Sequence, residues 1–231
     1  MMLQLILLLL VGGVIAWQAE RWNVNLPRWL SLATLLLGLL LVIGAVNGIP
    51  AEKFALASDP TNPQGWLLYS QHTWIPRFGI SLEFGMDGLS LLMLVLTLAL
   101  GGIAIVSSWD EIDFKPGFFQ ANLLWTLAGV VGVFLALDLF LFFLFWEVML
   151  IPMYLLIAIW GHENRGYAAM KFFIFTQVSG LLMLLSIVVL ALQAAKGGDI
   201  SFSYSDLLGN APAGRAGMLT MLGFFLAFTV K

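Results

Sequence analysis

The feature that most constrains the fold is an apolar run at residues 118–160. Its 43 positions hold only two side chains that carry a charge at pH 7 in water, Asp138 and Glu147. One helix of that length would extend ~64 Å at ~1.5 Å per residue, about twice the ~30 Å hydrocarbon core of a bilayer. The run therefore predicts two membrane crossings folded back on each other. We expect Asp138 at the turn, as the N-cap of the second helix.

Glu147 follows Asp138 by nine residues, which corresponds to ~14 Å along a helix and places it near the bilayer midplane. An acidic side chain at the centre of a membrane helix costs ~2.5–3.5 kcal/mol on insertion scales, and such groups usually line a pathway. We therefore expect Glu147 to handle a proton or another ion. The alternative is a neutral carboxyl group that only hydrogen-bonds a neighbouring helix.

Composition assigns the chain to the membrane class. Hydrophobic residues make up 61%, charged residues only 10%, and mean hydropathy is +0.99, whereas soluble domains carry about 25% charged residues. The absence of cysteine excludes a disulfide framework, a thiolate metal site and a cysteine-bound iron–sulfur cluster. Both histidines, His72 and His162, lie outside the apolar runs, so haem ligation between helices has no candidate.

Further apolar runs predict the other crossings. Four of them are expected to be further membrane spans: 2–17, 29–47, 86–109 and 170–192. The run 216–230 is shorter, at ~22 Å as a helix, and ends at Lys231. The expected fold is an all-α, polytopic transmembrane helix bundle. It has about six full spans and a seventh run that does not complete a crossing, and we expect the chain to be part of a longer protein.

The runs also divide the chain into regions. Residues 1–47 hold two N-terminal transmembrane helices, and 48–85 form a proline-rich extramembrane loop. Within that loop the alternating segment 80–84 predicts a short strand. Region 86–109 is the third transmembrane helix, and we expect Asp87 to serve as its N-cap.

A proline lies close to Glu147 in the sequence. Pro152 comes five residues later, where it removes a backbone hydrogen bond and is expected to kink or loosen the helix. Such interruptions are tolerated in membranes when neighbouring groups or waters satisfy the freed carbonyl. The pairing of an acid with a proline therefore favours a hydrated site over a dry one.

Several polar residues fall in the run 170–192. Thr176 and Ser179 share a face with Gly180 at helical spacing. Close helix packing explains this face, and the alternative is that it lines a file of water together with Gln177. Lys171 stands at the start of the run, where a lysine can extend its ammonium group to the interface.

The distribution of basic residues gives an orientation. The loops opposite the N-terminus carry Arg21, Arg28, Lys115, Arg165 and Lys171, and the loops on its own side carry Lys53, Arg77, Lys196 and Arg215. This excess favours an external N-terminus. The fifth and seventh spans would then both start at the outer face, which places Glu147 and Lys231 at comparable middle depths.

Four segments resemble one known family: residues 74–93, 132–162, 171–184 and 221–231. They are similar to the M chain, an antiporter-like membrane subunit, of bacterial proton-pumping NADH:quinone oxidoreductase (respiratory complex I). The core FWEVMLIPMY within 132–162 is the most specific part. The resemblance extends over nearly the whole chain in the same order.

The resemblance implies specific roles for residues. Family members contain inverted helix repeats, each with a broken helix, and a glutamate and a lysine that form an ion pair essential for pumping. Glu147 matches the glutamate and Lys231 the lysine, while Asp138 and Lys171 match other polar positions. Residues 117–231 would then be the first part, truncated, of the antiporter-like proton-translocating repeat, and the run 216–230 would be the first half of its broken seventh helix.

The resemblance also implies where the redox chemistry occurs. No cofactor or metal is expected in this chain, and NADH, FMN, iron–sulfur clusters and quinone are expected in partner subunits. The implied partners are other membrane subunits of complex I, including neighbouring antiporter-like chains, and the lipid bilayer, but no nucleic acid. The implied location is the bacterial inner (cytoplasmic) membrane. We expect the fragment alone to be inactive.

Two other functions stay open. The chain is more distantly similar to subunits of multi-subunit sodium/proton antiporters, and co-purification with flavin- and iron–sulfur-bearing subunits would separate the two. A purely structural helix bundle is the other alternative, and it predicts that Glu147→Leu assembles and changes no transport.

Coulomb attraction gives the Glu147–Lys231 pair a physical basis for pumping. This attraction is ~4 kcal/mol at ~4 Å and an effective dielectric of ~20, and half that at ~8 Å. Small movements of Lys231 would then decide whether Glu147 holds a proton.

Overall fold

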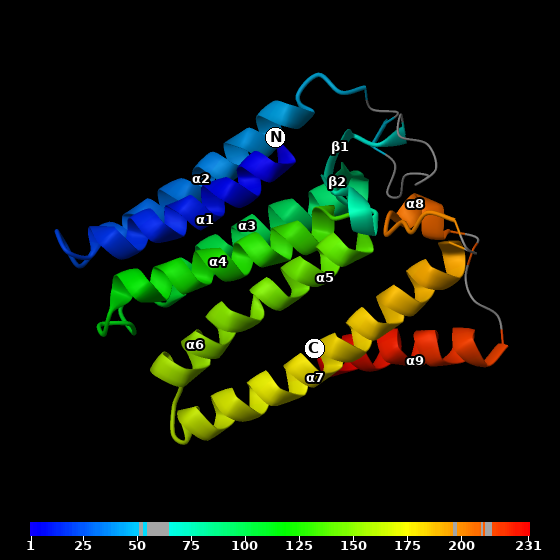
Figure 1. Cartoon of the computed structure of the whole chain (residues 1–231). Helices are drawn as coiled ribbons and strands as arrows, with labels where there is room; N and C mark the ends of the chain where they lie inside the picture. The colour runs from blue at the N-terminus through cyan, green and yellow to red at the C-terminus, as the bar shows by residue number, and fades with distance from the viewer. Residues whose placement is uncertain (51–52, 55–64, 196–197, 209, 211–213) are drawn as a thin grey trace.

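The computed structural model describes the chain except residues 51–52, 55–64, 196–197, 209 and 211–213. Long helices lie alongside one another, with a β-hairpin at one end of the bundle (Figure 1). The helices are α1 (Met2–Ala19), α2 (Leu26–Val46), α3 (Gly88–Ser107), α4 (Pro116–Leu135), α5 (Leu139–Val148), α6 (Leu150–Trp160), α7 (Arg165–Ala195), α8 (Tyr204–Leu207) and α9 (Gly214–Val230).

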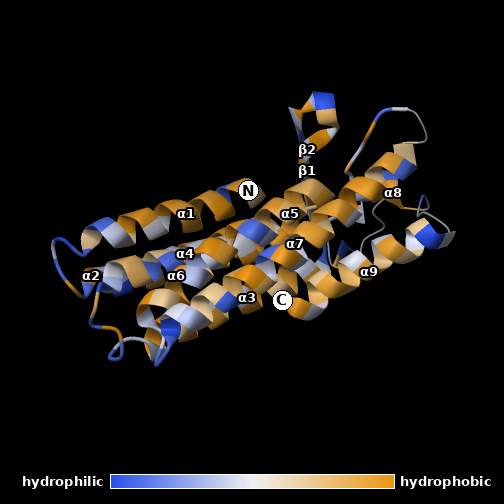
Figure 2. Ribbon diagram, turned by 60° about the horizontal axis from the view of Figure 1, so that its bottom comes forward, coloured by the Kyte–Doolittle hydropathy of each residue, from blue (hydrophilic) through white to orange (hydrophobic). Residues whose placement is uncertain are grey.

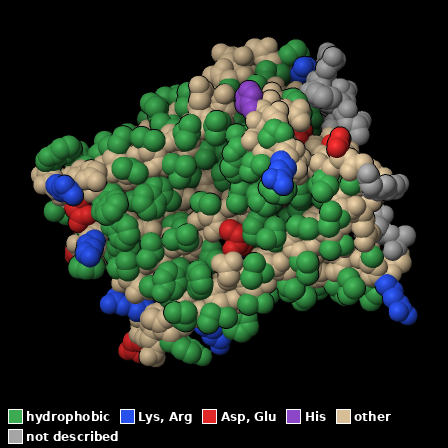
Figure 3. Space-filling model, in the orientation of Figure 1, with side chains coloured by type: hydrophobic (Ala, Val, Ile, Leu, Met, Phe, Trp, Pro, Cys, Tyr) green, Lys and Arg blue, Asp and Glu red, His purple; other side chains and the backbone are tan. Residues whose placement is uncertain are grey.

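The helices confirm the predicted polytopic all-α membrane bundle. Within the described residues, six helical segments are long and apolar enough to cross a membrane, with α5 and α6 counted together as Leu139–Trp160. Hydrophobic residues cover most of their length, and hydrophilic residues gather toward the ends (Figure 2). Figure 3 shows the same division on the surface, where hydrophobic side chains dominate and most of the visible lysines and arginines lie near the margins.

The hydrophobic core has two parts, each formed by a different group of helices. The first is formed by α1 to α4 and includes Leu9, Leu94 and Leu124. The second is formed around α5, α7 and α9 and includes Met183 and Ala227. Helix α4 contacts both parts, because it packs on α1, α2 and α3 as well as on α5 and α6.

A β-hairpin replaces part of the loop expected over residues 48–85. Strands β1 (Leu68–Ile75) and β2 (Ile80–Met86) pair antiparallel around the 3₁₀ turn η3 (Pro76–Phe78). The predicted strand at 80–84 is confirmed. The expectation of a loop was wrong for residues 68–75, because the polar centre of this segment, 70–73, gave little sign of a strand. Pairing with β2 stabilises it. The part of the expected loop at 51–52 and 55–64 lies outside the described residues.

Asp138 is the N-cap of α5, as predicted, and its side chain also bonds strand β2. Its Oδ1 accepts hydrogen bonds from the backbone N–H groups of Phe140 and Leu141, at 2.9 and 3.0 Å. Its Oδ2 accepts one from the backbone N–H of Ser81 in β2, at 3.0 Å. The Leu139 N–H also donates to the Phe202 carbonyl at 2.8 Å. These bonds fix where α5 starts, and hence how far along the bundle Glu147 lies.

The third transmembrane helix begins as predicted. The carboxylate of Asp87 accepts a hydrogen bond from the backbone N–H of Ser90 at 2.7 Å, so Asp87 is the N-cap of α3. Because this cap uses one bond and Asp138 uses several, the two aspartates differ in how much structure depends on them.

Candidate functional site

The helix that carries Glu147 is interrupted directly after it. Helix α5 ends at Val148 and α6 begins at Leu150, with Met149 between them. Pro152 has no N–H to donate to the Val148 carbonyl, and its ring crowds that same carbonyl. The predicted loosening therefore occurs within two residues of the acid.

The carboxylate of Glu147 faces α7. Gly180 leaves the space that it occupies, because a Cβ atom at that position would overlap Glu147 Oε1. The side chain of Gln177, one turn earlier on α7, hydrogen-bonds the carboxylate. Glu147 is half-buried, so its carboxylate packs against α7 while part of the side chain stays exposed.

Lys231 approaches the same site from the end of α9. Its Nζ donates a hydrogen bond to the backbone carbonyl of Trp146 and lies 4.4 Å from the centre of the Trp146 ring. It also interacts electrostatically with Glu147. Among the described residues, no direct ion pair within 4.0 Å joins the two side chains. The ammonium group of Lys231 therefore interacts with the carboxylate of Glu147 while it is hydrogen-bonded to Trp146.

The other predicted residues separate into two groups. Gln177 joins the site, whereas Thr176 and Ser179 are buried with hydroxyls that donate to their own helix, to the Phe172 carbonyl at 2.6 Å and the Thr176 carbonyl at 2.8 Å. That bonding fits the helix-packing interpretation. Lys171 is not brought to the site: it is exposed, and its Nζ lies 5.9 Å from the Tyr167 ring centre.

Trp146 is the residue that sequence reasoning missed. Its ring stacks on Phe142 at 5.6 Å between ring centres and meets Phe228 of α9 edge-on at 5.2 Å. It therefore holds the end of α9, which carries Lys231, against α5. Its position directly before Glu147 was the available signal, but nothing in the sequence placed Lys231 against its ring and carbonyl.

Charged and titratable groups gather at this site. A carboxylate, an amide and an ammonium group meet beside a helix interruption. In the part of the chain that the structure describes, no group of three or more His, Cys, Asp or Glu side chains could hold a metal ion. The acid–base groups of this site are Glu147 and Lys231.

These features define a polytopic helical membrane protein with an acidic and a basic side chain beside an interrupted helix. Residues 136–231 match the family model described as NADH:quinone oxidoreductase/Mrp antiporter, transmembrane. Proteins named NADH-quinone oxidoreductase subunit M are 48% identical in Escherichia coli K12 and 50% identical in Pseudomonas aeruginosa. Each alignment covers 98% of this chain and 45% of the relative.

A solved structure gives the same answer at the level of the fold. Respiratory complex I from Thermus thermophilus with bound NADH contains a chain that superposes with a TM-score of 0.80 at 27% identity, over 99% of this chain and 43% of that one. The chain belongs to the family of antiporter-like M subunits of NADH-quinone oxidoreductase. It spans about 45% of the length of the curated relatives it matches.

Proposed function

We propose that this chain is part of a membrane subunit that translocates protons in NADH:quinone oxidoreductase, and that Glu147 and Lys231 carry out the transfer. The observation that carries the proposal is their convergence beside the interruption between α5 and α6. Two ionisable groups from separate helices meet in an apolar bundle, where each is costly alone.

Trp146 supplies a second position for the lysine. In the present arrangement Nζ bonds the Trp146 carbonyl and lies over its ring. The attraction between the two charges is ~4 kcal/mol at ~4 Å and half that at ~8 Å. Moving Nζ from Trp146 onto the carboxylate of Glu147 would therefore strengthen it. When the lysine is close, Glu147 releases its proton, and when the lysine withdraws to Trp146, Glu147 takes one up. The displacement of one side chain thus sets the protonation of the other.

Electron transfer belongs to other subunits in this proposal. NADH, FMN, iron–sulfur clusters and quinone are held by partner chains, and their conformational or electrostatic output moves Lys231. The subunit lies in the bacterial cytoplasmic membrane beside other antiporter-like chains, with its N-terminus outside. The interrupted helix supports this coupling, because a break concentrates movement at the acid.

The test is proton pumping by the assembled oxidoreductase. Glu147→Gln keeps the size and the hydrogen-bonding capacity of the side chain but cannot exchange a proton, so we expect assembly without pumping through this subunit. Glu163→Gln is the matched control, because Glu163 is exposed in the loop between α6 and α7 and its loss changes net charge equally. Proton uptake by vesicles on addition of NADH reports the result. Full pumping by Glu147→Gln would refute the assignment.

A sodium/proton antiporter subunit is the second candidate, because the matching family model covers both groups. Purification of the native assembly separates them. Flavin- and iron–sulfur-bearing subunits accompany the chain if it serves the oxidoreductase, and they are absent if it serves an antiporter. A structural scaffold predicts instead that Glu147→Leu leaves all transport unchanged.

A further inference from the structure

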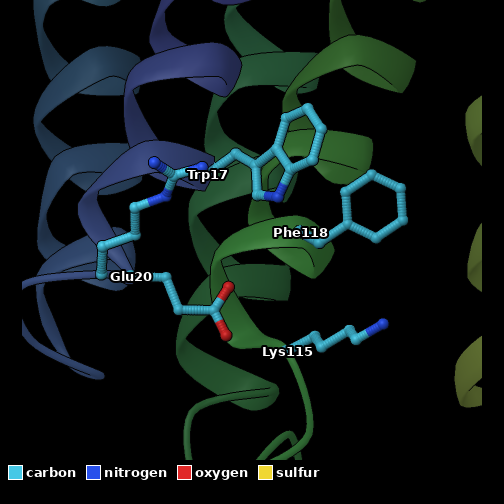
Figure 4. A pocket seen from close by; sticks show the side chains of 5 residues that line it. Trp17, Glu20, Lys115 and Phe118 are labelled. Carbon is cyan, nitrogen blue, oxygen red and sulfur yellow. The ribbon is translucent and has the colours of Figure 1, made fainter.

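A cavity lies at the end of the bundle opposite the hairpin. Its volume is about 470 Å³, and it is formed where α1 ends and α4 begins (Figure 4). Its lining residues are Trp17, Glu20, Arg21, Lys115 and Phe118. The proton-transfer proposal uses none of them, and they lie at the ends of membrane-spanning helices rather than in their middle.

The cavity has two cations without acidic partners. Among the described residues, neither Arg21 nor Lys115 forms an ion pair within 4.0 Å. Both residues are exposed. Lys115 has a positive φ of 49°, a conformation that non-glycine residues seldom adopt. The bend it makes at the start of α4 presents the lysine side chain at the rim of the cavity (Figure 4).

Glu20 is the only acid in the lining, and it is already engaged. Its side chain packs against Gly117 in the first turn of α4, where a Cβ atom would lie 2.8 Å from Glu20 Oε2. A carboxylate is stabilised there by the positive end of the helix dipole. The lining keeps one net positive charge, with both cations free to bind an anion.

Aromatic rings place the cavity at the membrane interface. Trp17 and Phe118 lie 5.2 Å apart between ring centres, and Phe118 lies 6.0 Å from Trp160 at the end of α6. Tryptophan collects at the level of lipid headgroups, where one end of the ring is apolar and the other is hydrated. A ligand here would meet aromatic surface on one side and cations on the other.

We propose that this cavity binds the headgroup of an anionic phospholipid of the phosphatidylglycerol type. Its phosphate pairs with Arg21 and Lys115, and its glycerol backbone lies along Trp17 and Phe118. A headgroup with one negative charge matches the net charge of the lining. The proposal is independent of proton transfer at Glu147.

The first experiment measures lipid binding by the native assembly. Delipidated complex is titrated with phosphatidylglycerol, phosphatidylcholine or inorganic phosphate, and bound lipid is counted by native mass spectrometry. Each basic group at a membrane surface contributes about a fivefold gain in affinity, so R21Q/K115Q should weaken the strongest phosphatidylglycerol binding by about 10- to 30-fold. The control, R77Q/R215Q, removes the same charge from residues outside this cavity and should leave that binding unchanged.

Other outcomes overturn the proposal. Equal phosphatidylglycerol binding by R21Q/K115Q and R77Q/R215Q would show that the cavity is not the site. Equal binding of phosphatidylcholine would show that the cations do not select the ligand. Saturation by inorganic phosphate, with loss of lipid binding, would identify a free-phosphate site.

A second experiment uses the unaltered protein, in case the double variant does not assemble. A phosphatidylglycerol carrying a photoreactive headgroup is cross-linked to the native complex, and the labelled peptides are sequenced. We expect labels at the end of α1 and the start of α4. Labels confined to other helices would contradict the proposal.

Discussion

Gly180 decides whether the carboxylate of Glu147 fits against α7. Because a Cβ atom there would overlap Glu147 Oε1, Gly180→Ala should push the carboxylate away from Gln177. Overpacking of this kind costs about 1–3 kcal/mol, and we expect proton pumping to fall several-fold in an assembled complex. Gly166→Ala on the same helix is the control, because a Cβ atom there meets nothing within 4 Å. Pumping at the control rate would show that the carboxylate does not need this position.

Tyr69 gives a pH-dependent prediction outside the membrane spans. Its hydroxyl donates to Glu83 Oε1 at 2.8 Å, and burial, together with this bond to Glu83, raises the pKa of Tyr69 to about 12. A raised pKa favours the neutral phenol in the folded state, so the stabilisation is complete below pH ~10 and lost as pH rises through 12.

Absorbance of tyrosinate during an alkaline titration checks this. The wild-type protein should show a late tyrosinate step near pH 12, and Tyr69→Phe should remove that late step. The result would be contradicted if the wild-type protein and Tyr69→Phe both lacked a late step.

Asp138 is expected to stabilise the start of α5 and its junction with β2 rather than to take part in proton transfer. Asp138→Ala removes an N-cap, worth about 0.5–2 kcal/mol, and leaves buried N–H groups of β2 and α5 unpaired at about 1–3 kcal/mol each. We expect a larger loss of unfolding free energy than for Asp87→Ala, whose carboxylate accepts one backbone bond in α3. Denaturation of the purified protein in detergent measures both variants. Equal losses would mean that the junction at Asp138 is not a main support of the fold.

At the scale of elements, the sequence was most informative where one segment determines its own structure. The length and polarity of residues 118–160 are enough to predict two crossings, a turn at Asp138 and a weakened helix before Pro152. Strand β1 was not predictable in this way, because its polar residues become a strand only by pairing with β2. Hairpin pairing depends on two segments, and neither alone identifies the partner.

The same distinction applies to the site. Glu147 was recognisable because an acid in an apolar run is costly wherever the run packs. The position of Lys231 over Trp146, and the exclusion of Lys171, depend on how α9 and α7 lie against α5. Those contacts join residues far apart in the chain, so spacing along the sequence does not reveal them.

At the scale of the whole molecule, the bundle brings an acid and a base together where α5, α7 and the end of α9 meet. In this mechanism, neither Glu147 nor Lys231 can support proton transfer without the other. Removing the charge of Lys231 should therefore stop proton transfer as completely as neutralising Glu147, although the two residues lie on different helices.

The most direct measurement is the number of protons pumped per NADH oxidised by the assembled complex carrying Lys231→Gln or Lys231→Arg. Arg215→Gln, at the start of α9, is the control for loss of one positive charge on the same helix. We predict that Lys231→Gln abolishes transport through this subunit, that Lys231→Arg retains part of it, and that the control matches the wild type. A wild-type ratio for Lys231→Gln would contradict the central claim.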